Sequence, residues 1–486
     1  MGGTEVASAS KSLTSREIAV PRRLRAAAAV LLLTALPVSG SAVAASAIPA
    51  NEVLLQPEAH HAGSASAAPP TTAVCEADFD IACYQPAQIR AAYHLGPLAA
   101  DGVTGHGQTI IIVDSFGSPT IASDLATFDA TFDLPAPPSF TVIQPAGKVP
   151  PYQPNDTREG WAGETNLDVE YSHAMAPGAS IVLVETPTSE NEGTTGFPQI
   201  VTAEEYVIDH HMGGVISQSF SATEETFPSA LSLQELRGAY VDAAANGITV
   251  LAASGDSGAA DVHNNEVTYY LTPVTSWPDS DPLVTGVGGT QLHLDSAGNK
   301  LSPDTAWNDT YNEPTQEYIF GNAGPNPLSG GGGKSIFFSR PSFQNGVAAV
   351  VGDQRGVPDI AMSAACNGAV DVYQSFAGQP VGWYPTCGTS EATPLFSGIV
   401  ALADQVAGHP LGVINPALYQ MLDTPSSGIV DVTSGNNTVS FPQGGTIHTV
   451  TGFSAAPGYD LASGVGTVDA TKFVPTLAAT VGIATG

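Results

Sequence analysis

Short apolar runs alternating with amphipathic stretches constrain the fold of this chain more than any other feature of its sequence. Six runs are apolar at successive positions, so both faces of each expected strand should be buried, as in a parallel sheet. These strands are expected at 109–114, 139–143, 180–185, 214–219, 247–253 and 282–287. Helical patterns at about 160–175, 199–210 and 229–245 separate them. The pattern predicts an α/β fold with a mostly parallel central sheet and helices on both faces.

The rest of the chain divides into a leader and a loop-rich part. Residues 288–385 are rich in Gly, Pro and Asn, which predicts long loops and hairpins. An apolar helix over 391–407 should end at Gly408, a suitable C-terminal cap. Residues 48–82 have few periodic apolar positions and are interpreted as a flexible leader or short propeptide. We therefore expect one folded domain over residues 83–486.

The first 47 residues have the pattern of a cleaved export signal. Arg22, Arg23 and Arg25 precede an apolar run over 26–38, and small residues follow it. The run is short for a bilayer span, and no later segment holds the roughly 18 uninterrupted apolar residues that a membrane helix needs. We expect cleavage near Ala44 or Ala47 and a secreted, extracellular protein without a membrane partner.

The charge balance restricts the classes of partner. The chain has 14 basic and 46 acidic residues, a formal net charge of -32 at pH 7. Such a surplus of negative charge disfavours nucleic acid and anionic membranes as partners and suits acidic surroundings. Hydrophobic residues make up 43% of the 486, enough for a large core, and we expect a monomer.

Four cysteines in an exported chain favour two disulfides over free thiols. Three pairings are formally possible, and the order along the sequence suggests Cys75 with Cys83 and Cys366 with Cys387. Zinc ligation is disfavoured because no Cys-x-x-Cys spacing occurs.

Ser390 stands where a Gly-Thr-Ser turn leads directly into the apolar helix predicted over 391–407. The amide groups and positive dipole end of a helix N-terminus suit a nucleophile whose transition state becomes anionic. The alternative interpretation is an ordinary N-cap serine, because Ser is among the favoured capping residues. Ser390 alone does not decide between the two.

A serine hydroxyl needs a group that removes its proton, and the helical segment 163–175 offers two acids. At about 100° per residue, Glu164 and Asp168 share one helix face with apolar side chains. The apolar residues on that face are Leu167, Tyr171 and Met175. A solvated acidic stripe would not share its face with apolar residues, and burying two acids is costly unless they serve a function. Glu170 and His173 are expected to point outward.

A third acid, Asp256, lies in a Gly-Asp-Ser-Gly turn after the strand expected over 247–253. It therefore lies beyond the carboxyl end of a buried strand, the edge where ligands bind in open α/β sheets. The alternative is an Asp selected only for its turn chemistry.

Three of these segments together resemble the signatures of the sedolisin family, serine-carboxyl peptidases with a subtilisin-like fold. They are the Gly-Thr-Ser turn ending at Ser390 with Pro394 after it, the helix that carries both acids, and the turn 254–258. The similarity extends from about Tyr84 to the C-terminus. It implies protein or peptide substrates and four catalytic residues: Ser390 as nucleophile, Glu164 as general base, Asp168 as its partner and Asp256 as oxyanion stabiliser.

The C-terminal segment resembles the calcium-binding loop region of the same family. The resemblance implies one structural Ca²⁺, held by side-chain oxygens of Asp431 and Asp460 and main-chain oxygens of Val432, Ala456 and Gly458. Hard oxygen ligands on irregular backbone suit this ion. The alternative is a turn rich in Gly and Asp that binds no metal.

The implied mechanism predicts activity at acid pH. Asp256 can stabilise an oxyanion only while it is protonated, whereas the base system of Glu164 and Asp168 must be ionised. These opposing requirements predict an optimum at about pH 3 to 5.

Two other functions compete with this hypothesis. One is a Ser/His/Asp subtilase that uses Asp114, at the end of the strand over 109–114, and His173 as base. The other is a secreted binding protein that keeps the fold without catalysis. The sequence also departs from the sedolisin pattern, because 48–82 is too short and too polar for the large folded pro-domain of that family, so we expect a member that lacks it.

Overall fold

The computed structural model describes residues 1–2, 60–61, 65–154, 156–422, 424 and 426–484. The chain divides into two units, Met1–Pro49 and Ala50–Gly486, and all the secondary structure given below belongs to the second. The predicted signal peptide lies outside the described residues, apart from its first two. Among the residues that are described, no helix has the length and apolar character needed to cross a membrane.

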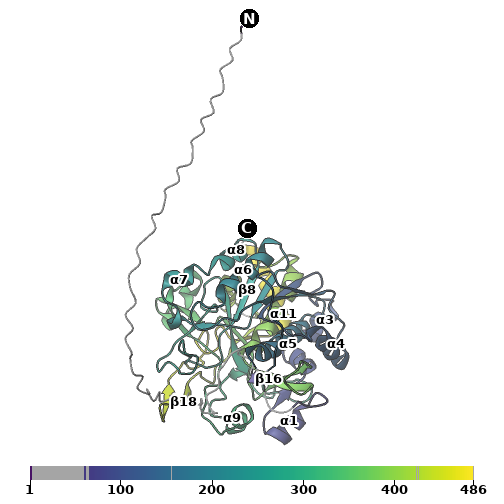
Figure 1. Cartoon of the computed structure of the whole chain (residues 1–486), viewed down its shortest axis with the longest axis vertical. Helices are drawn as coiled ribbons and strands as arrows, with labels where there is room; N and C mark the ends of the chain where they lie inside the picture. Colours follow the sequence, from purple (N-terminus) through teal and green to yellow (C-terminus); the bar gives the residue numbers. More distant parts are fainter. Residues whose placement is uncertain (3–59, 62–64, 155, 423, 425, 485–486) are drawn as a thin grey trace, which may run out of the picture. The chain divides into compact units, whose positions relative to one another are not determined.

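A central sheet of eight strands organises the second unit (Figure 1). Its strands are β3 (Thr109–Ser115), β4 (Phe140–Ile143), β5 (Ser180–Thr186), β6 (Val215–Gln218), β8 (Thr249–Ala253), β10 (Thr285–Gln291), β11 (Thr305–Ala306) and β14 (Ile360–Ser363). The strand order is β11-β10-β8-β6-β3-β5-β4, and β14 pairs with β10. Every pair is parallel except β10 with β11, so the prediction of a mostly parallel sheet is confirmed.

Both faces of the sheet are buried because successive apolar side chains of each strand enter different cores. In β3, Ile110 and Ile112 belong to the core beneath α5 (Thr157–Met175) and α11 (Thr389–Ala407). Ile111 and Val113 belong to the core beneath α6 (Phe197–Asp209) and α8 (Gly238–Ala245). Alternation with a period of two thus fills both faces, and helices cover each of them.

The predicted elements agree with the observed ones to within a few residues. The expected helix over 229–245 is two helices, α7 (Ala230–Gln234) and α8, separated at Arg237, whose guanidinium binds Asp281. Asp156 caps α5 by accepting a hydrogen bond from the Arg158 amide at 2.9 Å. Gly408 ends α11 in the left-handed region, at a φ of 78°, as predicted.

Smaller elements surround the sheet. The helices are α2 (Pro86–Ala92), α3 (Leu95–Ala100), α4 (Ile121–Phe132), α9 (Glu313–Phe320), α10 (Ala348–Val351), α12 (Asn415–Leu422) and α13 (Ala470–Ala484). The strands are β7 (Ala222–Thr223), β9 (Ser276–Trp277), β12 (Gly333–Ser339), β13 (Gln354–Val357), β17 (Ile429–Val430), β18 (Val439–Gln443), β19 (Thr446–Val450) and β20 (Thr467–Val468). As expected for 288–385, hairpins are prominent there.

Ordered structure begins earlier than the sequence predicted. The expected flexible leader contains a helix, α1 (Thr72–Phe79), and a short strand, β1 (His60–His61). Strand β1 belongs to a second sheet with the order β1-β16-β15-β2, whose other strands are β16 (Gly382–Cys387), β15 (Ala369–Gln374) and β2 (Cys83–Tyr84). A disulfide between Cys75 and Cys83 ties α1 to β2, and a second joins Cys366 to Cys387. Both predicted disulfides are confirmed, and the first explains why 72–82 is not a loose leader.

Candidate active site

Helices α5 and α11, which carry the predicted base pair and nucleophile, pack side by side (Figure 1). The hydroxyls of Ser172 and Ser397 lie 3.0 Å apart, and a Cβ at Gly398 would lie 2.4 Å from the Met175 Cβ. The helices therefore run in the same direction. Two turns toward the N-terminus, about 10–12 Å from this contact, lie Ser390 in the first turn of α11 and Glu164 on α5.

Ser390 is the second residue of α11 and is fully buried. The N-cap is Gly388, so the interpretation of Ser390 as an ordinary N-cap serine is wrong. Pro394, one turn further on, has no amide hydrogen to donate to the Ser390 carbonyl. The nucleophile candidate therefore lies in the first turn of the helix, where negative charge is favoured.

Asp256 lies directly beside the nucleophile turn. Its Oδ1 accepts hydrogen bonds from the Thr389 amide at 2.7 Å and the Thr389 hydroxyl at 2.8 Å. The Thr389 hydroxyl also accepts from the Gly255 amide at 3.1 Å. A Cβ at Gly331 would lie 1.8 Å from the Ser254 carbonyl oxygen, so glycine is required where that strand passes the turn. The structure thus brings Asp256 to the residue that precedes Ser390.

Asp168 lies one turn after Glu164 and is fully buried. The Ser219 hydroxyl donates a hydrogen bond of 2.9 Å to its Oδ1. Burial raises the pKa of Asp168 well above its ordinary value, and the charges of Asp114 and Glu164 raise it further. These groups interact closely enough to titrate as one system rather than as separate acids.

Asp114, at the end of β3, belongs to this acid system. Burial raises its pKa to about 7, and the charge of Glu185 adds to the increase. The charge of Asp114 in turn raises the pKa of Asp168. The two buried carboxyl groups therefore influence each other's ionisation.

The arrangement of a Ser/His/Asp subtilase is not formed. His173 Nε2 lies 3.1 Å from Asp129 Oδ1 on α4 and 2.8 Å from the Pro135 carbonyl oxygen. The charge of Asp114 instead acts on Asp168. His173 and Asp114, the base and acid that a Ser/His/Asp subtilase would need here, therefore interact with different neighbours.

The outward orientation expected for Glu170 and His173 is wrong. Both side chains are fully buried, because α4 and β15 cover the side of α5 that faces away from α11. Glu170 accepts a hydrogen bond from the Tyr373 amide of β15 at 3.0 Å. The helix carries polar residues on this side because they have buried partners there, not because water reaches them.

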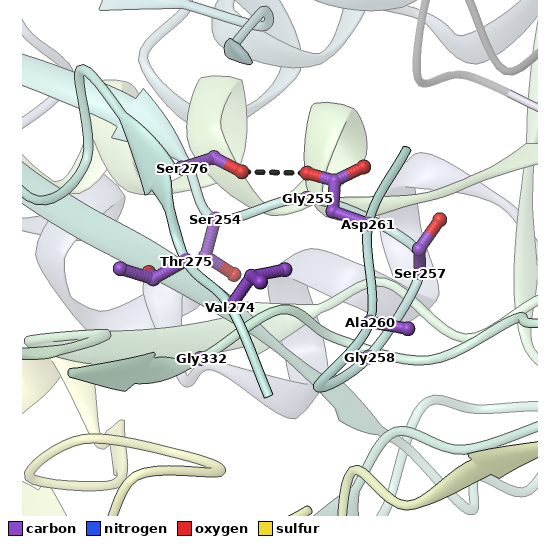
Figure 2. Close-up of a pocket in the computed structure, with 10 residues that line it drawn as sticks. All are labelled: Ser254, Gly255, Ser257, Gly258, Ala260, Asp261, Val274, Thr275, Ser276 and Gly332. Atoms are coloured by element: carbon purple, nitrogen blue, oxygen red, sulfur yellow. Dashed lines mark hydrogen bonds between the residues drawn. The ribbon is translucent and has the colours of Figure 1, made fainter. Parts of the chain in front are cut away.

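A narrow pocket adjoins the Asp256 turn (Figure 2). Its lining includes the turn residues Ser254, Gly255, Ser257 and Gly258, and Figure 2 shows Asp261 on one wall bonded to Ser276. Asp261 accepts a hydrogen bond of 2.6 Å from the Ser276 hydroxyl and one of 2.8 Å from the Val262 amide. Burial raises the pKa of Asp261, and the charge of Asp256 adds to the increase.

Two further acids near the site were missed by the sequence analysis. Burial raises the pKa of Glu190 well above its ordinary value, with a contribution from the charge of Glu164. The pKa of Glu192 is raised to about 9 by burial and by the charge of Asp261. Both lie in the loop after β5, and only the fold brings that loop to α5. The nearest available signal was the Glu-x-Glu pair itself.

The five residues of the predicted calcium loop lie together. Asp431 Oδ2 accepts a hydrogen bond of 3.0 Å from the Gly458 amide, and Asp460 Oδ2 accepts one of 2.8 Å from the Ala456 amide. Val432 follows Asp431 directly. No group of three acidic, His or Cys side chains gathers as a metal site within the described part of the chain. Two carboxylates plus carbonyl groups would nevertheless be the donor set expected for a hard cation.

Comparison with known proteins assigns the chain to a family. Residues 158–444 match the subtilase family. The chain is 32% identical to kumamolisin of Bacillus sp. (strain MN-32) over 79% of its own length and 61% of the relative. It is 29% identical to sedolisin of Pseudomonas sp. (strain 101), covering 77% of this chain and 58% of that one.

The solved structures agree with this assignment. A structure of Pseudomonas sedolisin, described as a serine-carboxyl proteinase in complex with pseudo-iodotyrostatin, is 26% identical with a TM-score of 0.66. The alignment covers 81% of this chain and 97% of that one. The chain therefore belongs to the subtilase family. Its relatives place it among the sedolisins within that family. The chain spans about 60% of the length of kumamolisin and of sedolisin.

Proposed function

We propose that this protein is a serine-carboxyl peptidase that hydrolyses peptide bonds of proteins or peptides through an acyl-enzyme on Ser390. The observation that carries the proposal is the attachment of the Asp256 carboxyl to Thr389, the residue before Ser390. Membership of the sedolisins supports it. So does the buried acid pair on α5, which packs beside α11.

Each side chain has a distinct role in the proposed reaction. Glu164 accepts the Ser390 proton as the hydroxyl oxygen attacks the substrate carbonyl, and Asp168 takes part in holding that proton. Protonated Asp256 donates a hydrogen bond to the oxyanion of the tetrahedral intermediate. The proton then passes to the leaving amine, and the same pair activates the water that hydrolyses the acyl-enzyme.

The proposed mechanism operates at acid pH. Above the range in which Asp256 is neutral, its carboxylate would repel the developing oxyanion. We therefore keep the predicted optimum of about pH 3 to 5. An acidic extracellular environment after export would suit both this chemistry and the large surplus of acidic residues.

The turn beside Asp256 is the proposed site for the substrate side chain on the acyl side of the scissile bond, and the narrow pocket there would have to widen to admit it. It adjoins the residue that would bind the oxyanion, so a substrate held there presents its carbonyl to Ser390. Asp261 on its wall would favour a basic side chain when ionised. Because burial raises the pKa of Asp261, this preference should strengthen as the pH rises.

One structural Ca²⁺ is part of the proposal. Asp431, Val432, Ala456, Gly458 and Asp460 would hold it through carboxylate and carbonyl oxygens. The convergence of both carboxylates on the loop 456–463 supports this assignment. The ion would stabilise the loop, and no catalytic step depends on it.

Casein digestion by wild type and two variants tests the proposed function. Ser390→Ala should reduce the rate of hydrolysis by roughly 10⁴-fold or more. In a protein that only binds, the substitution would change no hydrolysis. Glu164→Gln should reduce it by roughly 10²- to 10⁴-fold, whereas a Ser/His/Asp enzyme would keep its activity. Undiminished digestion by Ser390→Ala would reject the assignment.

A further inference from the structure

Ser390 and Asp256 follow strands of two different sheets. Strand β16, in the second sheet, ends at Cys387, and α11 begins two residues later at Thr389. Asp256 follows β8, a strand of the central sheet. Helix α11 packs against the central sheet, so the short turn before Ser390 passes from one sheet to the other. The relative position of the two proposed catalytic groups therefore depends on how this turn is held.

Cys366, one member of the second disulfide, lies in a segment that is bonded to the central sheet. Two residues before it, the Ala364 amide donates a hydrogen bond of 3.0 Å to the Thr290 carbonyl oxygen. One residue after it, the Asn367 carbonyl oxygen accepts a hydrogen bond of 3.0 Å from the Gln291 side-chain amide. Thr290 and Gln291 are the last two residues of β10, which runs parallel to β8. The segment is therefore anchored at the sheet edge from which the turn after β8 leaves.

Two bonds attach the turn before the nucleophile to this anchored segment. The disulfide joins Cys366 to Cys387, and both residues are fully buried. The Gly388 amide donates a hydrogen bond of 2.8 Å to the Ala364 carbonyl oxygen. Gly388 has a φ of 124°, a conformation that residues with a side chain rarely adopt. The direction in which the chain enters α11 is thus fixed by a covalent bond, a hydrogen bond and a glycine conformation.

A displacement of Cys387 would be passed on to Ser390 because only two residues separate them. The first, Gly388, is bonded to the anchored segment, and the second, Thr389, donates hydrogen bonds of 2.7 and 2.8 Å to Asp256 Oδ1. The turn therefore has one attachment to the end of β10 and another to the turn after β8. A misplacement of about 1 Å at a catalytic group can reduce a rate by roughly 10²-fold.

The other disulfide, between Cys75 and Cys83, is the same kind of bond in a different place. It ties α1 to β2, and β15 lies between β2 and β16 in the second sheet. The sequence separations of the two disulfides are 8 and 21 residues, and the entropic effect of a cross-link on the unfolded chain grows slowly with loop length. A role limited to stability would therefore make the two bonds similar in their effects.

We propose that the disulfide between Cys366 and Cys387 is a positioning element of the peptidase. It holds the turn before the nucleophile so that Ser390 and Asp256 act on the same carbonyl group of the substrate. The inference rests on the proposed peptidase function and adds a positioning role for this bond to it. The sulfur atoms take no part in the reaction and act through the placement of Gly388.

Replacing each disulfide by a pair of alanines tests the proposal in peptide hydrolysis at about pH 4. Cys366→Ala with Cys387→Ala should lower kcat about tenfold or more and change KM by less than about twofold, because a misplaced nucleophile loses transition-state stabilisation without loss of substrate binding. Cys75→Ala with Cys83→Ala is the matched control and should keep both constants within about twofold of wild type. Near-UV circular dichroism at the assay temperature measures the folded fraction, and kcat is expressed per folded molecule.

A second variant covers the case in which the alanine pair at the active site does not fold. Cys366→Val with Cys387→Ala refills much of the space of the two sulfur atoms without restoring the bond, and the same loss of kcat is expected. Failure of both variants to fold would overturn the proposal, because the bond would then be required for folding rather than for placing Ser390.

The kinetic outcomes separate this inference from the proposed function. A folded variant without the Cys366–Cys387 bond that keeps kcat within about twofold of wild type overturns the positioning role. An equal loss of kcat in the Cys75→Ala, Cys83→Ala control also overturns it, because lower stability would then explain both results. Equal hydrolysis by wild type and Ser390→Ala would overturn the proposed function and this inference with it.

Discussion

Replacing Glu204 by Gln should make the fold less sensitive to rising pH. Glu204 lies on α6, fully buried, and its Oε1 accepts a hydrogen bond from the Gln218 side-chain amide. Burial raises its pKa from 4.5 to about 8, the bond from Gln218 lowers it, and the charge of Glu205 raises it. Gln has nearly the shape of the protonated acid and cannot ionise, so the variant removes only the titration.

The sign and size of the effect follow from this shift. The pKa is higher in the folded state than in the unfolded one, so the stability that the group contributes is full below pH 4.5 and is lost as the pH rises through 8. A shift of about 3.5 units at about 1.4 kcal/mol per unit gives an upper bound of about 5 kcal/mol. Relaxation around the ionised group should reduce the measured difference to roughly 2–4 kcal/mol.

Urea unfolding at pH 4.5 and pH 8, in a Ser390→Ala background that prevents self-digestion, measures this difference. Between the two pH values the parent should lose roughly 2–4 kcal/mol more than Glu204→Gln. Glu205→Gln is the matched control: it removes the same charge at the next residue and should reduce the pH dependence only slightly, because the charge of Glu205 is a minor cause of the raised pKa of Glu204. An identical pH dependence for the parent and Glu204→Gln would refute the reasoning.

Two further predictions concern the pocket and the loop. Asp261→Asn should lower kcat/KM about tenfold at pH 6 for substrates with Arg or Lys on the acyl side of the cleaved bond, and by less than twofold for Leu; equal losses would contradict it. Chelation should lower the midpoint of thermal unfolding by several degrees, and Asp460→Asn should remove that response, so an insensitive wild type argues against calcium.

The central sheet could be predicted because its signal is local. Residues Ile110 to Val113 are all apolar, and the structure explains this by sending alternate side chains to the two cores. The acid pair was also visible, because Glu164 and Asp168 share a helix face with apolar residues. Burial of both acids is as the helical pattern implied.

The orientation of Glu170 and His173 could not be predicted for a physical reason. A helical pattern reports which residues share a face, and polar residues on one side ordinarily indicate solvent. Here α4 and β15 cover that side and supply polar partners such as Asp129 and the Tyr373 amide. Such partners come from segments about 40 to 200 residues away along the chain.

Nonlocal contacts also explain the leader and the additional acids. Helix α1 has little amphipathic pattern, and it is held by a disulfide to Cys83 and by a hydrogen bond from the Thr72 hydroxyl to the Cys83 carbonyl oxygen. Asp261 follows Asp256 by only five residues, yet its hydrogen-bond partner on the pocket wall, Ser276, is 15 residues further along the chain. Neither relation has a local sequence signal.

The pH dependence of kcat/KM for peptide hydrolysis from pH 3 to 8, compared between wild type and Ser390→Ala, tests the central claim most directly. The proposed system of Ser390, Glu164, Asp168 and Asp256 predicts Ser390-dependent activity with a maximum at about pH 3 to 5 and a decline toward neutrality. Maximal Ser390-dependent cleavage at pH 8 would contradict it, because an ionised Asp256 could not stabilise the oxyanion.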